Sequence, residues 1–172
     1  DQYSVEVIVN SSATTTTTLA SDDFSSGDYT NGTGTDWVTN WGEFETLNNI
    51  FDGDAPDSFT DTSPGGNNRI TVSGGQLLLQ DDNRGAERTI NLDGKTGTVT
   101  LEFDYETIGT VPSATTDLEI RVSNDNRASF ETIETVDLDT DPSSGKISAE
   151  IPSSHFGTNT IISIGVESVT GT

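Results

Sequence analysis

The sequence predicts an all-β fold in which antiparallel sheets pack face to face. Short segments rich in β-branched and aromatic residues recur, and clusters of glycine, asparagine, aspartate and proline separate them. No segment between these turns carries an apolar repeat of helical period. In the stretch 101–105, apolar and acidic residues alternate, so one face of that strand meets a core and the other meets water. This spacing is typical of an antiparallel β-sandwich or jelly roll.

Residues 1–18 form a separate unit in this prediction. The segment 3–9 alternates and is β-branched, so we expect a strand. The polar tract 10–18 ends in five consecutive threonines and is typical of a linker or an extended connection. Two alternatives stay open for the strand: it ends the preceding module of a tandem array, or it pairs into the main sandwich.

Residues 19–172 are expected to form the jelly-roll domain. It begins with a polar loop to Asp36, an aromatic stretch and a long loop over 48–68. Strand signals then follow at close intervals, with turn signals between them at 73–75, 93–94, 124–126 and 141–143. The predicted strands are 69–72, 76–80, 88–92, 98–107, 116–123, 131–138, 146–151 and 160–168.

The charge balance is strongly acidic. Acidic residues outnumber basic ones 29 to 7, and the formal net charge is −22. Nucleic acids and anionic membranes need a basic surface, so neither is expected as a partner. Self-repulsion of this size opposes compaction unless cations or salt offset it. The absence of cysteine excludes a thiolate metal site, and no apolar run has membrane-spanning length, so we expect no membrane insertion. A cysteine-free, acidic, threonine-rich β-chain is what we expect of a large exported surface protein, so we expect an extracellular location. We also expect a monomer.

Carboxylate clusters make Ca²⁺ the expected cofactor, because this hard cation binds several carboxylate, carbonyl and water oxygens. For each acid, a solvated surface carboxylate is the alternative. The group at 137–141 precedes Pro-Ser-Ser-Gly and is ranked lower, because a plain turn explains it equally well. The candidate clusters are Asp22 with Asp23, Glu43, Asp81 with Asp82 and Asn83, the acids at 52, 54 and 57, and the acids at 137, 139 and 141.

Aromatic residues supply the candidate ligand platform. Trp37, Trp41 and Tyr29 could stack on a sugar ring, whose C–H face complements an aromatic face. Packing of both tryptophans into the core is the favoured alternative. His155 is the single histidine, and no nucleophile-elbow motif is present, so we expect no enzymatic activity.

The order of several motifs resembles a bacterial jelly-roll family over roughly residues 19–168. Its members are calcium-binding, carbohydrate-binding-module-like domains of repeats-in-toxin (RTX) adhesins and secreted hydrolases. The motifs are Asp-Asp-Phe at 22–24, Trp-x-x-x-Trp-x-Glu at 37–43, Gly-Gly-Gln-Leu-Leu-Leu-Gln-Asp at 74–81, Glu-Arg-Thr-Ile-Asn-Leu-Asp-Gly at 87–94, Thr-Leu-Glu-Phe-Asp-Tyr at 100–105 and Glu-Ile-Arg-Val-Ser-Asn-Asp at 119–125.

The resemblance also has a gap. Family members usually close with a further strand, which this sequence lacks. Three explanations stay open: truncation, continuation beyond an inserted domain as in the "split" domain of marine adhesins, or replacement by the segment 3–9.

The resemblance implies a non-catalytic module on the bacterial cell surface that extends or presents a ligand-binding neighbour in adhesion and biofilm formation. Its partners would be neighbouring domains of the same adhesin. It favours Asp22, Asp23, Glu43, Asp81 and Asp82 as calcium ligands. A carbohydrate-binding module that binds glycans directly is the alternative.

Overall fold

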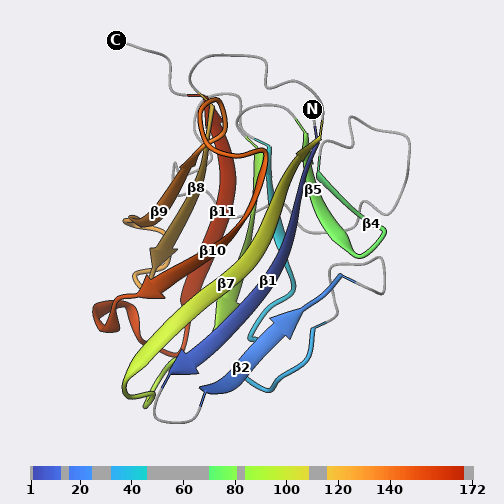
Figure 1. Ribbon diagram of the computed structural model, residues 1–172. Helices are drawn as coiled ribbons and strands as arrows, with labels where there is room; N and C mark the ends of the chain where they lie inside the picture. Colours follow the sequence, from blue (N-terminus) through green and yellow to red (C-terminus); the bar gives the residue numbers. More distant parts are fainter. Residues whose placement is uncertain are drawn as a thin grey trace.

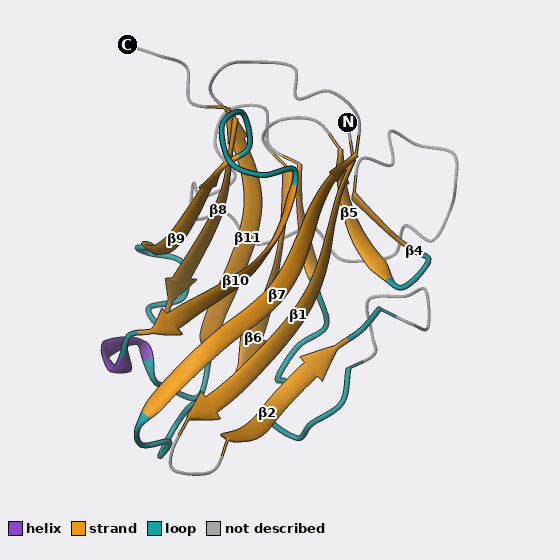
Figure 2. Ribbon diagram, viewed as in Figure 1, coloured by secondary structure: helices purple, strands orange, loops and turns teal. Residues whose placement is uncertain are grey.

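The computed structural model describes residues 2–12, 16–24, 32–45, 70–80, 84–108 and 116–168. Within these residues the chain forms antiparallel strands and one turn of 3-10 helix, as Figure 2 shows. The elements are β1 (Gln2–Ser12), β2 (Thr16–Asp22), β3 (Gly42–Glu45), β4 (Ile70–Ser73), β5 (Gln76–Gln80), β6 (Arg84–Ile90), β7 (Thr98–Ile108), β8 (Thr116–Ser123), β9 (Glu131–Asp137), β10 (Ser144–Ile151), the 3-10 turn η1 (Ser153–His155) and β11 (Thr160–Ser168).

The first sheet, sheet A, has the strand order β10-β7-β1-β5-β4, with β2 paired to β1 (Figure 1). One edge of β1 pairs with β7 along its whole length, from Gln2 opposite Ile108 to Ser12 opposite Thr98. The other edge is shared, because β5 pairs with its first residues and β2 with its last. The segment predicted as a strand at 3–9 therefore has the added-strand arrangement. Residues 16–18, predicted to be part of a linker, instead form the first half of β2.

The second sheet, sheet B, has the order β3-β6-β11-β8-β9 and lies behind sheet A in Figure 1. Its strands alternate between a core face and an outer face. Ala86 on β6, Ile164 on β11 and Ile120 on β8 are paired neighbours, and all three belong to the core. The intervening residues Glu87 and Ser163 are paired on the outer face. Both faces of β6 are buried, which is unusual for a strand with three charged residues.

One hydrophobic cluster is shared by both sheets. Leu77 and Leu79 on β5, and Leu101 and Phe103 on β7, contribute from sheet A, while β6, β8 and β11 contribute from sheet B. Trp41 is fully buried within it. The predicted all-β fold of antiparallel sheets is therefore confirmed. Among the described residues, no helix is long and apolar enough to cross a membrane.

Every predicted strand corresponds to a strand of the structure, although several ends are displaced, and larger differences occur at three places. β8 matches its prediction residue for residue. β2 and β3 were not predicted, and β6 begins at Arg84 rather than at Arg88. The missed part of β6, Arg84–Glu87, contains two charged residues and a glycine, and Glu87 is buried but paired with Arg127, which a pattern of apolar and polar residues does not reveal.

Candidate functional site

Asp22, predicted as a calcium ligand, lies at the end of β2 and is buried. Its Oδ2 accepts a hydrogen bond from Nη1 of Arg88 at 2.5 Å and from the indole Nε1 of Trp41 at 3.1 Å. Its Oδ1 accepts from the backbone N–H of Phe24 at 2.9 Å. Burial raises the pKa of Asp22, and these hydrogen bonds and the Arg88 charge counteract that rise. Protein donors therefore occupy both oxygens of this carboxylate.

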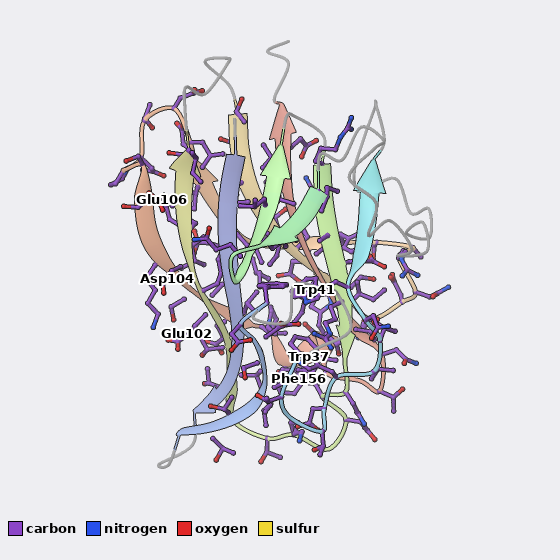
Figure 3. All side chains as sticks on the ribbon, turned by 90° about the vertical axis from the view of Figure 1, so that its right-hand side faces the viewer. Trp37, Trp41, Glu102, Asp104, Glu106 and Phe156 are labelled. Carbon is purple, nitrogen blue, oxygen red and sulfur yellow. The ribbon has the colours of Figure 1, made fainter. Side chains whose placement is uncertain are left out.

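The two tryptophans lie beside the same ion pair. Trp37 and Trp41 have ring centroids 6.1 Å apart, and the guanidinium of Arg88 lies 4.2 Å from the centroid of Trp37. Trp37 is partly buried, and its Nε1 donates to the carbonyl of Ser21 at 3.3 Å. Trp41 is 0% exposed, so its ring has no face open to a sugar. Figure 3 shows Trp41 between the sheets and Trp37 below it.

The structure describes the remaining predicted calcium ligands only in part. Asp23 follows it and is exposed. Glu43 lies on β3, opposite Ala86, but its side chain lies outside the described structure. Asp81, Asp82 and Tyr29 lie outside the described residues, as do the acids at 52, 54 and 57. Among the described residues, no group of three acidic or histidine side chains has the geometry to hold a metal ion.

The lower-ranked acids at 137–141 form a hydrogen-bonded turn after β9. Oδ1 of Asp137 accepts from the backbone N–H groups of Asp139 and Thr140, and its Oδ2 accepts from the Thr140 hydroxyl at 2.7 Å. These hydrogen bonds, that of the hydroxyl first, lower the pKa of Asp137. The turn explanation accounts for these contacts.

Carboxylates gather at one end of the outer face of sheet B. Asp117 on β8 is paired with Glu167 on β11 and with Asp137 on β9, so three acids lie side by side across the strands. Burial raises the pKa of Asp117, and the charges of Asp137 and Glu119 raise it further. Burial also raises the pKa of Glu167, although Arg121 lies 2.9 Å away. Ionised carboxylates repel one another here.

A second acidic surface lies on sheet A. Glu102, Asp104 and Glu106 alternate along β7, on the face away from the core, and Figure 3 shows them along the outer side of that strand. Lys146 on β10 is paired with Asp104, and its Nζ lies 3.6 Å from Oε2 of Glu102. These acids are solvated, as the alternation in the sequence predicts.

The opposite end of sheet B carries a polar pocket that the sequence did not indicate. It has a volume of about 520 Å³, within the range of small-molecule sites. Thr89 and Ile161, paired neighbours on β6 and β11, lie on the outer face of the sheet and line it. The other lining residues are Thr39, Asn124, Asp125, Asn126, Arg127 and Asn159.

The β8–β9 loop, residues 124–130, forms a wall of this pocket and is braced by Asp125. Oδ1 of Asp125 accepts from the Ser123 hydroxyl at 2.7 Å and from the Ser129 N–H at 3.0 Å, and Oδ2 accepts from the Ser129 hydroxyl at 2.5 Å. These hydrogen bonds, those of Ser129 first, lower the pKa of Asp125 to about 2. The loop holds Asn126 and Arg127 at φ 59° and 72°, the left-handed region that non-glycine residues rarely adopt.

Arg127 connects this loop to the sheet. Its Nε donates to Oε1 of Glu87 at 2.8 Å, and its Nη2 contacts the same oxygen. Glu87 is 2% exposed, and burial raises its pKa while Arg127 lowers it. The other carboxylate oxygen of Glu87, and the hydroxyl of Ser163 paired opposite it, are buried and have no hydrogen-bond partner within the described part of the chain. In the sequence, the turn signal Asn-Asp-Asn at 124–126 located this loop but did not indicate its contacts with the sheet.

Comparison with known proteins gives no match. No family model, no curated protein and no solved structure matches the chain.

Proposed function

We propose that this chain is a non-catalytic extracellular module of a bacterial surface adhesin, stabilised by calcium, that extends or presents a ligand-binding neighbour. The observation that carries the proposal is the row of Glu167, Asp117 and Asp137 across three strands of sheet B. Their mutual repulsion opposes folding, and divalent cations that gather near this acidic face would offset it. The net charge of −22 causes self-repulsion across the whole chain, which cations would offset in the same way.

The resemblance to RTX adhesin domains supplies the cellular setting. Extracellular fluids contain calcium at millimolar levels, which suits the weak affinity of extracellular calcium modules. Stability would then be linked to the calcium concentration, because an ion that binds only the folded state stabilises it. β1 is paired on both edges, with β7 on one side and with β5 and β2 on the other. This pairing holds the N-terminal segment in the sheet, which suits a module that transmits tension.

Direct glycan binding through an aromatic platform has less support. Trp41 is fully buried, and Arg88 covers Trp37. Both contacts favour a core role for the two tryptophans.

Thermal unfolding at low ionic strength tests the proposal. We expect a higher Tm with a few millimolar CaCl₂ than with chelator, and a smaller rise with NaCl of equal ionic strength. The variants Asp23→Asn, Glu43→Gln and Asp81→Asn test the expected ligand set, and Asp117→Asn tests the acidic row. An equal effect of sodium and calcium would mean that screening alone stabilises the chain. An unchanged melt would refute calcium stabilisation.

A further inference from the structure

The pocket beside the β8–β9 loop is built from groups that both donate and accept hydrogen bonds. Its lining has three asparagines and two threonines, with Ile161 as an apolar contact. The side-chain amide of Asn124 already has a partner, because its Nδ2 donates to the carbonyl of Ser154 at 2.7 Å. Within the described part of the chain, no group bonds to the Asn126 amide, and Asn159 contacts only Thr158, at 3.5 Å. Two amides are thus available to a ligand.

The charged side chains of the pocket already have partners within the protein. Arg127 is paired with Glu87, and Asp125 accepts hydrogen bonds at both of its oxygens. An anionic ligand would find no unpaired cation in Arg127 and would meet a protein of net charge −22. A cation would have to share the Asp125 carboxylate with the three hydrogen bonds that it already accepts. The uncommitted groups therefore suit a neutral ligand.

Hydroxyl groups are the natural partners of these amides, since an amide and a hydroxyl can each donate and accept. We propose that this pocket binds a neutral saccharide, through hydrogen bonds to Asn126 and Asn159 and apolar contact with Ile161, independently of calcium. This role goes beyond the proposed calcium-dependent structural role and uses neither Trp37 nor Trp41.

The structure also keeps the pocket ready for its ligand. The Asp125 hydrogen bonds and the Arg127–Glu87 pair fix the loop from two sides, while Asn126 and Arg127 keep left-handed backbone angles. Such angles cost free energy and persist only where the surroundings enforce them. A loop fixed in advance loses less conformational entropy when it binds.

The test is an NMR titration of the ¹⁵N-labelled protein with a panel of neutral hexoses and N-acetylhexosamines, with chelator and again with calcium. Each sugar is raised to about 50 mM, enough to reveal millimolar affinity. We expect at least one sugar to shift the amide signals of 124–127, 159 and 161, with the same Kd in both buffers. Shifts confined to other residues, no shifts at all, or a Kd that requires calcium would overturn the proposal.

Two variants identify the groups that bind. Asn126→Gly removes the amide but tolerates the positive φ, and Asn159→Ala removes the second amide. Each should weaken binding about three- to ten-fold, the effect of one hydrogen bond. The matched control is Asn40→Ala, an exposed residue in the loop before β3 that does not line the pocket, and its Kd should be unchanged. Equal effects in all three variants would overturn the assignment.

A charged sugar separates the ligand classes. The hexuronic acid that matches the best hexose should bind more weakly, because no unpaired cation receives its carboxylate. Tighter binding of the uronic acid would overturn the inference of a neutral ligand. Calcium-independent binding would stand even if the melts showed no calcium effect, so the two proposals fail separately.

Discussion

The carboxylate of Asp22 lies 2.5 Å from Nη1 of Arg88, although 66 residues separate the two in the sequence. Their side chains are 0% and 4% exposed, and Trp41 donates to the same oxygen of Asp22. The pair joins the end of β2 to β6 and so connects sheet A to sheet B. Arg88 also donates from Nε to the carbonyl of Thr39 at 2.9 Å, which fastens the loop before β3.

Removing the Asp22 charge should therefore destabilise the fold. Asp22→Asn leaves Arg88 as a buried charge without its counterion, and such a loss costs about 3–5 kcal/mol of the free energy of unfolding. Urea unfolding followed by tryptophan fluorescence measures it. The control Asp104→Asn removes an exposed acid from β7 and should change that free energy by less than about 0.5 kcal/mol. Similar small losses in both variants would contradict a structural role for the pair.

Such pairs mark the limit of what the sequence could predict. Alternation and turn residues located β8 and β5 correctly, because each has one face in the core and a recognisable turn beside it. The threonine run was predicted as a linker, yet threonine is β-branched, and β2 pairs with the last residues of β1. Formation of such a polar strand depends on a partner strand that is distant in the sequence or, as here, equally polar. The sequence pattern of the strand itself therefore does not predict it.

The candidate site was predictable only in part. Asp22 and Trp41 were predicted as site residues, but Arg88 was predicted only as part of the strand 88–92, and no sequence signal paired it with Asp22, which lies 66 residues away. The pocket depends on the pairing of Thr89 with Ile161 and on Arg127 reaching Glu87. No local pattern encodes these contacts between distant strands.

The acidic row of sheet B should oppose stability at neutral pH. The folded-state pKa of Asp117 is raised above its ordinary 3.8. Below that pH the protonated carboxyl group does not weaken the fold, and stability is lost as the pH rises through the folded-state pKa. Asp117→Asn should raise Tm at pH 7 by about 1–3 °C. Calorimetry at low salt measures the gain.

The gain from Asp117→Asn should disappear below about pH 3.8, where Asp117 is protonated in both states, and it should shrink in high salt. Glu150→Gln, an exposed acid on β10, is the control and should show no such pH-dependent gain. A destabilised Asp117→Asn variant at pH 7 in calcium-free buffer would contradict the repulsion.

Asp125 should show the opposite pH behaviour. Its pKa of about 2 lies below the ordinary 3.8, so its stabilising contribution is present above that value and is lost as pH falls towards 2. A ¹³C NMR titration of the aspartate carboxyl groups should give Asp125 a midpoint near 2. In the Ser129→Ala variant, which removes the hydroxyl donor, the midpoint should rise towards the ordinary value. An unchanged midpoint would mean that this hydroxyl does not hold the carboxylate.

Gly145 should not tolerate a side chain. A Cβ there would lie 2.8 Å from Cε1 of Tyr105, whose hydroxyl donates to the carbonyl of Pro142 at 3.1 Å. Gly145→Ala must displace this ring, at a cost of about 1–3 kcal/mol in the free energy of unfolding. Gly157→Ala is the matched control, because a Cβ at that position meets no atom within 4 Å. Chemical denaturation compares the two, and an equal loss would exclude crowding against Tyr105 as the cause.

The pair of Arg127 with Glu87 should make stability depend on pH once it is broken. Arg127→Met removes the charge that lowers the pKa of Glu87 and leaves the burial that raises it, so that pKa should rise further above 4.5. In the Arg127→Met variant, ionisation of Glu87 therefore does not lower the free energy of unfolding below about pH 4.5. The free energy of unfolding falls as the pH rises through the new folded-state pKa. The deficit relative to wild type should therefore be small at pH 4 and grow towards pH 8, which unfolding at several pH values measures. The double variant Glu87→Gln with Arg127→Met should lose this pH dependence, because position 87 then carries no carboxyl group to ionise. If the deficit were constant across pH, Arg127 would stabilise the loop by packing and not by neutralising Glu87.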